Sequence, residues 1–355
     1  MAPARAARRT VRLTLACDNR CVFCAQEGVR ASAAVDEAPI AARLASARAA
    51  SDEITFVGGE PTLDPDLAAH VAAARVLGFR GVGIQTNGRR LAETGYAASL
   101  ARAGLTDVHL SIHGADARAH DYHTGIDGSF AQVLVGLAAA RASGLVVVAT
   151  TALTRSSFRV LAPIPKLLAS RGVAAWVVAV VRTAGRAATA SDRIVPRLAL
   201  AIPFALHALE TADAIGLPAW IAGAPACLLG PLASRAIADL ERAYGDACSA
   251  CDARAACPGV DPDYLARFGG DELAPRATYL PATSRPDLRA MFVGVGELAS
   301  APVRAATPRA KVALPVLGKV RPAHAEVGAG TKKKSGDALR EILPALFDDG
   351  RKKGD

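Results

Sequence analysis

The stretch LTLACDNRCVFCAQEG, from Leu13 to Gly28, places three cysteines within eight residues. Cys17, Cys21 and Cys24 are separated by three and then by two residues, and they directly follow an apolar run. In a reducing compartment, clustered cysteines with short gaps indicate metal ligation before disulfides. The loop therefore predicts a metal site rather than a disulfide framework.

Three cysteines on one loop match an iron–sulfur cube with one open position. Such a cube holds four irons, and each protein ligand is a thiolate, so three cysteines leave the fourth iron uncovered. An open metal position separates reactive sites from closed structural ones, as it does for zinc. A zinc ion needs a fourth ligand nearby, and the candidates Asp18 and Glu27 are poor ones. We therefore favour a cluster over zinc or inert thiols.

Apolar runs rich in β-forming residues recur along the chain, with helix-like segments between them. The repeat of about 25 to 40 residues is typical of βα units with right-handed crossovers. Six units predict an α/β fold, a partial (β/α)6 TIM-type barrel, followed by a small C-terminal Cys-rich segment. The six runs are VRLTL from Val11, EITFV from Glu53, GVGIQT from Gly81, DVHLSI from Asp107, LVVVATT from Leu145 and AAWVVAVV from Ala174.

Polar and glycine-rich residues follow every one of these runs. The cysteine loop comes after the first, GGEP after the second, TNGRR after the third and SIHG after the fourth. The carboxyl ends of barrel strands are where α/β barrels build their active sites. The sequence therefore predicts one functional site that is shared by these loops.

The motif C-D-N-R-C-V-F-C resembles the signature of the radical S-adenosylmethionine superfamily, Cys-x3-Cys-x2-Cys with an aromatic residue, here Phe23, before the last cysteine. The resemblance covers about residues 10–185. It implies that Cys17, Cys21 and Cys24 hold a [4Fe-4S] cluster and that S-adenosylmethionine binds the open iron through its amino and carboxylate groups. It also implies reductive cleavage of the sulfonium bond to a 5′-deoxyadenosyl radical.

The resemblance extends to other strand ends. GGEP, Gly58–Pro61, resembles the second motif of that family, in which glycines let backbone groups approach the methionine amino group; an ordinary tight turn is the alternative. Positions after the third and fourth runs resemble those that line the methionine and ribose, with an Asn-Gly turn and a hydrogen-bonded loop histidine as alternatives. The implied cofactor-binding residues are Phe23, Gly58, Gly59, Glu60, Pro61, Asn87 and Ser111, beside Thr86 and His113.

For the substrate side of the site, the sequence leaves the assignments open. Thr150, Thr151 and Arg182 follow the fifth and sixth runs and face either the substrate or the protein interior. No catalytic residue is assigned.

A second cysteine group lies between residues 227 and 257. Cys248, Cys251 and Cys257 have the spacing Cys-x2-Cys-x5-Cys, and Cys227 precedes them. The group resembles the SPASM and twitch extensions of radical S-adenosylmethionine enzymes that modify peptides and proteins. A SPASM domain has seven cysteines and this segment has four, which implies one auxiliary cluster at most. A four-cysteine zinc knot is the alternative, and ligation by Cys227 is open because distance in sequence does not show proximity.

The chain divides by composition into four parts. We expect a core barrel over residues 1–185, a linker with a helix around Leu198–Ile215 over 186–226, an auxiliary iron–sulfur segment over 227–280, and a basic, partly flexible tail over 281–355.

Charge and hydropathy limit the classes of partner that we expect this protein to bind. The 355 residues carry a net charge of +9, and residues 301–355 alone hold 12 Lys and Arg against 6 Asp and Glu. The rest of the chain is nearly neutral, which disfavours nucleic acid except through the tail. No apolar run approaches the roughly 20 residues of a membrane span, and the N-terminus lacks the apolar region of a signal peptide. We therefore expect a cytoplasmic protein with no membrane partner.

The leading hypothesis is a radical S-adenosylmethionine enzyme that modifies a peptide or protein side chain, reduced by a donor such as ferredoxin or flavodoxin. One alternative keeps this chemistry and changes the substrate to a nucleotide or RNA. Against it, aromatic residues are 5% of the chain, which leaves few rings to stack on bases. The other alternative is a non-catalytic metal-binding or electron-transfer protein, which an open three-cysteine loop disfavours.

Overall fold

The computed structural model describes residues 8–26, 38–237 and 243–275. All described residues belong to one compact unit. Glu27 and the predicted basic tail, 281–355, lie outside the described residues.

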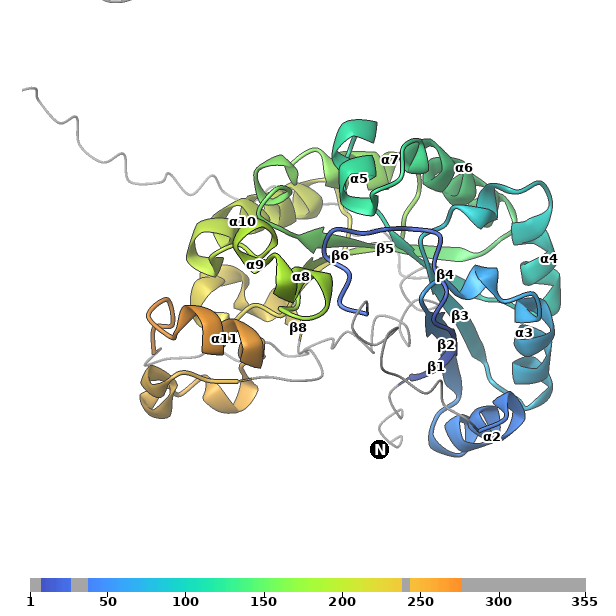
Figure 1. Ribbon diagram of the computed structural model, residues 1–355, viewed down its shortest axis with the longest axis horizontal. Coiled ribbons are helices and arrows are strands. Elements are labelled where there is room, and N and C mark those ends of the chain that lie inside the picture. Colours follow the sequence, from blue (N-terminus) through green and yellow to red (C-terminus); the bar gives the residue numbers. More distant parts are fainter. Residues whose placement is uncertain (1–7, 27–37, 238–242, 276–355) are drawn as a thin grey trace, which may run out of the picture. The chain divides into compact units, whose positions relative to one another are not determined.

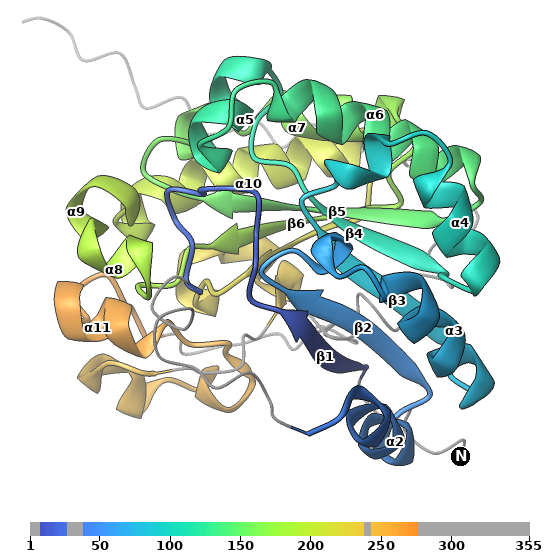
Figure 2. The same cartoon turned by 45° about the vertical axis from the view of Figure 1, so that its right-hand side comes forward.

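A single parallel sheet of eight strands organises the described residues. The strands follow one another in chain order from β1 to β8, each hydrogen-bonded to the next (Figures 1 and 2). Within the described ranges β1 and β8 are the two edges, so the sheet stays open. The strands are β1 (Arg9–Thr14), β2 (Glu53–Gly58), β3 (Gly81–Thr86), β4 (Asp107–Ser111), β5 (Val146–Leu153), β6 (Ala175–Val180), β7 (Ala219–Ala222) and β8 (Ala236–Ile237).

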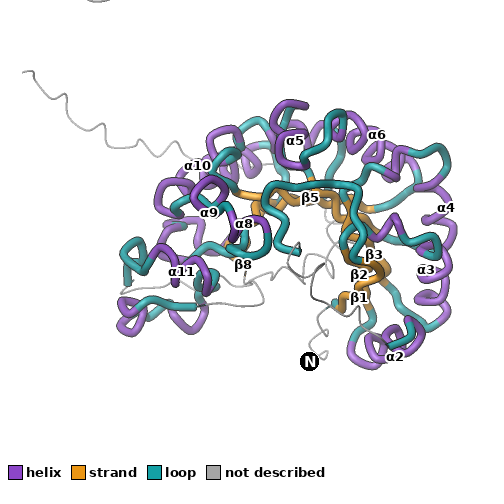
Figure 3. Tube along the Cα trace, viewed as in Figure 1, coloured by secondary structure: helices purple, strands orange, loops and turns teal. Residues whose placement is uncertain are grey.

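Helices cover the outer face of this sheet (Figure 3). Most connect one parallel strand to the next, as crossover connections must. The helices are α2 (Ile40–Ala50), α3 (Leu67–Val76), α4 (Tyr96–Ala103), α5 (Ala117–Thr124), α6 (Ser129–Ala142), α7 (Ile164–Ser170), α8 (Arg186–Thr189), α9 (Ser191–Ile194), α10 (Leu198–Ala214) and α11 (Pro262–Phe268).

β5 and β6 read as nearly unbroken apolar runs because most of their residues on both faces are buried. Ile54 and Phe56 of β2 point to the outer face and belong to the large core beneath the helices. The inner face of β5 to β8 carries a second, smaller apolar cluster that includes Val148 and Val177. These two cores hold the strand ends in fixed positions, which is what the site above them requires.

The predicted partial barrel is confirmed, but the predicted number of strands is wrong. The sheet adds β7 and β8 to the six expected strands, and the stretch read as a linker, 186–226, contains α8, α9 and β7 as well as the expected helix α10. Strands of four and two residues give too little alternating pattern to be found in a sequence. Their place in the sheet comes from pairing, of β7 with β6 and of β8 with β7.

One described stretch is long and apolar enough to cross a membrane by length and composition. It runs over Ser191–Ala214, and half of its most apolar window is buried inside the protein. Seven residues of α10, among them Leu198, Ile202 and Leu209, are buried in the core. A core helix passes the same test, so this stretch is accounted for by packing.

Candidate active site

A cavity of about 300 Å³ lies at the carboxyl ends of the strands. The cysteine loop, the GGEP turn and the ends of β3 to β6 all contribute to its walls. Pro61 and Thr151 do not line it, although the sequence placed them near the site. The predicted residues that do line it are Cys17, Cys21, Phe23, Cys24, Gly58, Gly59, Glu60, Thr86, Asn87, Ser111, His113, Thr150 and Arg182.

The cysteine loop is held on one side by the end of α5. The backbone N–H of Arg20 donates to the carbonyl of Thr124 at 2.8 Å, and that of Val22 donates to the carbonyl of His123 at 3.0 Å. Gly125 follows α5 with a positive φ of 68°, and a Cβ there would meet the Arg20 carbonyl at 2.8 Å. The loop and the helix end therefore approach each other closely.

On its other side the loop is held by the residues that follow β6. The guanidinium of Arg186 donates to the carbonyl of Cys21 at 2.7 Å, and the Arg186 N–H donates to the carbonyl of Cys24 at 2.9 Å. Gly185 has φ of 55°, and a Cβ there would lie 2.5 Å from the Cys24 carbonyl. Contacts from both sides thus fix the loop without using any of its sulfurs.

The electrostatics of the three thiols favour a bound cation. Burial, together with the nearby Cys17 and Cys24, raises the pKa of Cys21 to about 12. Ionising three thiols at one buried place is costly unless positive charge is bound there. The N–H of Asn19 donates to the sulfur of Cys17 at 3.4 Å, which stabilises a thiolate.

The three thiols of the cysteine loop share one cavity. Cys17, Cys21 and Cys24 all line it. Cysteines on an iron–sulfur cube each bind a different iron, so three thiolates around one cavity can hold three of its irons. Among the described residues, no group of three His, Cys, Asp or Glu side chains is already placed around a single metal ion.

The two glycines of the GGEP turn make room for the cysteine loop itself. A Cβ on Gly58 would lie 2.3 Å from the carbonyl oxygen of Thr14, and one on Gly59 would lie 2.2 Å from that of Ala16. The Gly59 N–H donates to the Thr14 carbonyl at 2.8 Å. The glycines therefore allow β2 to lie directly against the start of the loop, a requirement that the family resemblance did not suggest.

Glu60 is buried and joins three segments. Its Oε1 accepts hydrogen bonds from the N–H and hydroxyl of Thr62 and from the hydroxyl of Thr86, the last at 2.6 Å. Its Oε2 accepts from the N–H of Asn87 at 2.7 Å. Burial raises the pKa of this carboxyl group, and the hydrogen bonds oppose that rise. These contacts make Glu60 a residue that positions the ends of β2 and β3.

Asn87 and Asp18 connect the end of β3 to the cysteine loop. The Asn87 amide donates to the carboxylate of Asp18 at 2.7 Å. The other oxygen of Asp18 pairs with the guanidinium of Arg89 at 3.0 Å, and Arg89 also donates to the Asp18 carbonyl. Both carboxylate oxygens of Asp18 thus have partners within the protein. These contacts assign Asp18 to holding the cysteine loop against the end of β3.

A histidine cluster around Phe23 was not anticipated from the sequence. The ring of His113 contacts Phe23 edge-on with centroids 4.7 Å apart, and His120 stacks on His113 at 5.8 Å. The Nδ1 of His113 accepts from the Ala152 N–H, so its neutral ring carries the proton on Nε2. Burial lowers the pKa of His113, His120 and His123. The signal was the pattern of three histidines over residues 113–123.

Two threonines of β5 have different surroundings. Thr150 lines the cavity and hydrogen-bonds to the Nε2 of His109 on the neighbouring strand β4. Thr151 points to the other face, donates to the Ile112 carbonyl at 2.6 Å and accepts from the Trp176 indole at 2.9 Å. Thr151 therefore has a structural role, the alternative that the sequence left open.

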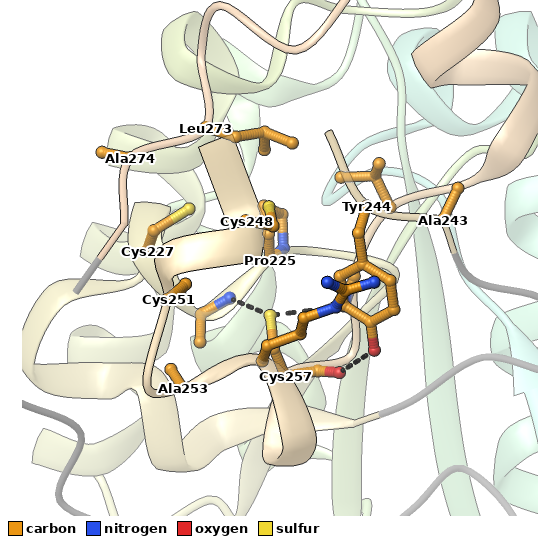
Figure 4. Close-up of a pocket in the computed structure, with 14 residues that line it drawn as sticks. Pro225, Cys227, Ala243, Tyr244, Cys248, Cys251, Ala253, Cys257, Leu273 and Ala274 are labelled. Carbon is orange, nitrogen blue, oxygen red and sulfur yellow. Dashed lines mark hydrogen bonds between the residues drawn. The ribbon is translucent and has the colours of Figure 1, made fainter. Parts of the chain in front are cut away.

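The second cysteine group surrounds a separate cavity of about 20 Å³ (Figure 4). Cys227, Cys248, Cys251 and Cys257 all line it, so the structure brings Cys227 next to the other three. Burial raises the pKa of Cys227, and the nearby Cys257 and Cys248 add to the rise. The donor set is that of a closed four-thiolate site. As described, the cavity has room for about one water molecule, so a cluster requires these side chains to move apart.

Cys257 has the surroundings of a thiolate. Its sulfur accepts hydrogen bonds from the N–H groups of Ala226 at 3.3 Å and Gly259 at 3.4 Å (Figure 4). The hydroxyl of Tyr244 donates to the Cys257 carbonyl at 3.0 Å. Hydrogen bonds to sulfur stabilise its negative charge and tune a bound centre.

The second cysteine segment is attached to the barrel by polar contacts. The carboxylate of Asp261, which caps α11, accepts from the N–H of Thr183 at 2.7 Å. The hydroxyl of Tyr264 accepts from the N–H of Leu198 at 2.9 Å and contacts the carboxylate of Glu272. Because Thr183 directly follows Arg182, this attachment also fixes one wall of the active-site cavity.

Comparison with known proteins finds a family that matches part of the chain. Residues 11–155 match the radical SAM superfamily. Over 142 residues, 40% of this chain and 38% of the relative, the chain is 31% identical to an AdoMet-dependent heme synthase of Nitratidesulfovibrio vulgaris. Over 139 residues, 38% of this chain and 44% of the relative, it is 32% identical to a probable GTP 3′,8-cyclase of Saccharolobus islandicus. The chain thus spans about two fifths of the length of these curated relatives.

A solved structure has a similar fold. Streptococcus suis SuiB bound to precursor peptide SuiA superposes with a TM-score of 0.50 and 13% identity, over 77% of this chain and 75% of that one. At this identity the likeness concerns the fold. The matched stretch, 11–155, contains the three-cysteine loop, the glycine pair and the strand ends that face them. The likeness to the radical SAM superfamily therefore rests on residues 11–155, about two fifths of the chain, which include the cysteine loop and the glycine pair.

Proposed function

We propose that the protein is a radical S-adenosylmethionine enzyme whose substrate is a peptide or protein side chain. The observation that carries the proposal is the shared cavity of Cys17, Cys21 and Cys24 with the Gly58–Gly59 turn at the carboxyl ends of the strands. When bound there, a [4Fe-4S] cluster and S-adenosylmethionine supply reductive cleavage to a 5′-deoxyadenosyl radical, which abstracts hydrogen from the substrate.

The protein's own residues position this chemistry. Contacts from α5 and Arg186 hold the cysteine loop, and Glu60 holds the ends of β2 and β3. Phe23 and His113 form an aromatic wall beside the cysteines. Arg182 supplies a cationic side chain to the same cavity.

The second cysteine group supports the peptide or protein as substrate class. Four thiols line one cavity, and the resemblance to twitch-type extensions implies that they hold an auxiliary cluster once their side chains have moved apart. SuiB, whose fold is similar, was crystallised with a precursor peptide. A nucleotide remains the second candidate because one curated relative is a probable GTP 3′,8-cyclase. That match covers only the shared domain and does not separate the two classes.

The test is anaerobic reconstitution of the full chain with iron and sulfide, followed by reduction with S-adenosylmethionine. The proposal expects absorbance near about 410 nm from thiolate-bound clusters and release of 5′-deoxyadenosine. Cys21→Ala removes a ligand of the first cluster and is expected to abolish 5′-deoxyadenosine and to reduce the absorbance to the share of the second cysteine group. Arg102→Glu changes an exposed residue of α4 and serves as the control. A wild-type chain that binds iron yet forms no 5′-deoxyadenosine contradicts the proposal.

A further inference from the structure

The outer edge of β1 is free for pairing within the described residues. β1 pairs with β2 on one side, and no described strand lies on its other side. The carbonyl of Arg12 accepts a hydrogen bond from the guanidinium of Arg43 and so points away from β2. Backbone groups two residues apart in a strand point to the same side, so the N–H and carbonyl of Thr10 also face this edge. Thr10 is exposed.

A groove of about 540 Å³ lies beside this edge. One wall is β1 from Arg9 to Arg12, and the other is α2. The α2 wall presents small side chains at four-residue intervals, Ala42, Ser46 and Ala50, which lie along one face of the helix. This wall leaves room for a polypeptide to lie next to β1.

The groove carries uncompensated positive charge. Arg9, Arg12 and Arg43 line it, none of them forms an ion pair in the part of the chain that the structure describes, and no described Asp or Glu lines it. The Nε of Arg12 is buried without a hydrogen-bond partner. A buried cationic nitrogen without a partner is unfavourable, so an anionic ligand would stabilise this arrangement.

We propose that this β1–α2 groove binds an extended, acidic segment of a polypeptide by strand addition to β1. Main-chain hydrogen bonds to Thr10 supply affinity, and the three arginines select acidic side chains. β1 ends at Thr14, three residues before Cys17, so a segment added to β1 runs toward the active-site cavity. The natural ligand is then the peptide or protein substrate, a step that rests on the proposed function.

Charge argues against the chain's own tail as the occupant. Residues 301–355 carry 12 Lys and Arg against 6 Asp and Glu, so they repel the arginines of the groove. The acidic segment of a second polypeptide is the complementary partner.

Binding of a labelled octapeptide with alternating Glu and Val, measured by fluorescence anisotropy on the full chain, tests the proposal. An octapeptide with alternating Lys and Val is the control ligand. Arg9→Glu is expected to weaken binding of the acidic peptide about fivefold or more, whereas Arg102→Glu on α4 leaves it unchanged. Thr10→Pro removes the edge N–H and is expected to weaken binding similarly, whereas Thr10→Val keeps the N–H and the affinity.

Several outcomes would overturn the proposal. The first is that the wild-type chain does not bind the acidic peptide. The second is that it binds the acidic and the basic peptide equally well. The third is that Arg9→Glu and Arg102→Glu weaken binding of the acidic peptide to the same extent. A wild-type chain that binds neither peptide because its tail or a second copy fills the groove counts among them. Thermal unfolding of each variant checks that Arg9→Glu and Thr10→Pro still fold. The assay needs neither iron nor S-adenosylmethionine, so its failure is distinct from absence of 5′-deoxyadenosine.

Discussion

At Gly59 the protein has no room for a side chain. A Cβ there would lie 2.2 Å from the Ala16 carbonyl and 2.4 Å from that of Leu15, both backbone atoms that cannot rotate away. We expect Gly59→Ala to lower the free energy of unfolding by about 1–3 kcal/mol, the usual cost of overpacking. Because the displaced backbone begins the cysteine loop, iron bound after reconstitution should fall as well.

The matched control for Gly59→Ala is Gly270→Ala. A Cβ on Gly270 meets its nearest atom at an ordinary 3.4 Å. Urea unfolding and iron content should stay at wild-type values in this control. Equal stability and iron content in the two variants would contradict the role given to Gly59.

Glu60 offers a second test on the scale of one side chain. Its two carboxylate oxygens accept from Thr62, Thr86 and Asn87 in a buried setting. Glu60→Gln replaces one acceptor oxygen by an NH₂ group that must face a donor, which should cost about 1–3 kcal/mol. Urea unfolding measures the loss. Glu93→Gln, at an exposed carboxylate beside Arg90, should change stability far less.

On the scale of one element, α5 makes stability depend on pH. His120 and His123 lie on α5 and His113 packs against it, and burial lowers the pKa of each, that of His120 to about 4. Below pH 6.5 these histidines therefore bind protons in the unfolded chain but stay neutral in the folded chain. The free energy of unfolding is fully retained above the ordinary histidine pKa and falls as the pH drops toward 4.

His120→Gln removes one of these titrating groups. Between pH 6 and 4.5 we expect the slope of the unfolding free energy against pH to decrease by about 1 kcal/mol per pH unit. Urea unfolding at several pH values measures the slope. A loss of packing energy in the variant lowers the free energy of unfolding equally at every pH and leaves the slope unchanged. His207→Gln, at an exposed histidine of α10, should leave the slope as it is. An unchanged slope in His120→Gln would show that this ring is not kept neutral by the fold.

For the whole molecule, the sequence predicted those features whose signals are local. Apolar runs such as that from Val146 in β5 and the spacing of Cys17, Cys21 and Cys24 are local patterns, and both lead to the observed sheet and cavity. β8, with two residues, has no pattern of its own and exists through pairing with β7. Its position could be found only from the folded chain.

Contacts between residues that are distant in the chain could not be predicted from the sequence either. The sequence could not show that Cys227 lies beside Cys257, or that Gly58 and Gly59 serve the approach of the cysteine loop. The sequence also could not show that the carboxylate of Glu60 accepts hydrogen bonds from within the protein. Each of these depends on which segments the sheet brings together, and this is set by tertiary packing rather than by neighbours in the chain.

The two cysteine cavities together predict the metal content of the molecule. If each holds a [4Fe-4S] cluster, the reconstituted chain contains about eight irons, and Cys21→Ala and Cys251→Ala each retain about four. Cys251→Ala should still form 5′-deoxyadenosine, because the first cavity is intact, whereas Cys21→Ala should not. Iron and zinc are measured by elemental analysis, with Arg102→Glu as the control. About four irons and one zinc in the wild-type chain, with the zinc lost in Cys251→Ala, would assign the second cavity to structural zinc and exclude the auxiliary cluster.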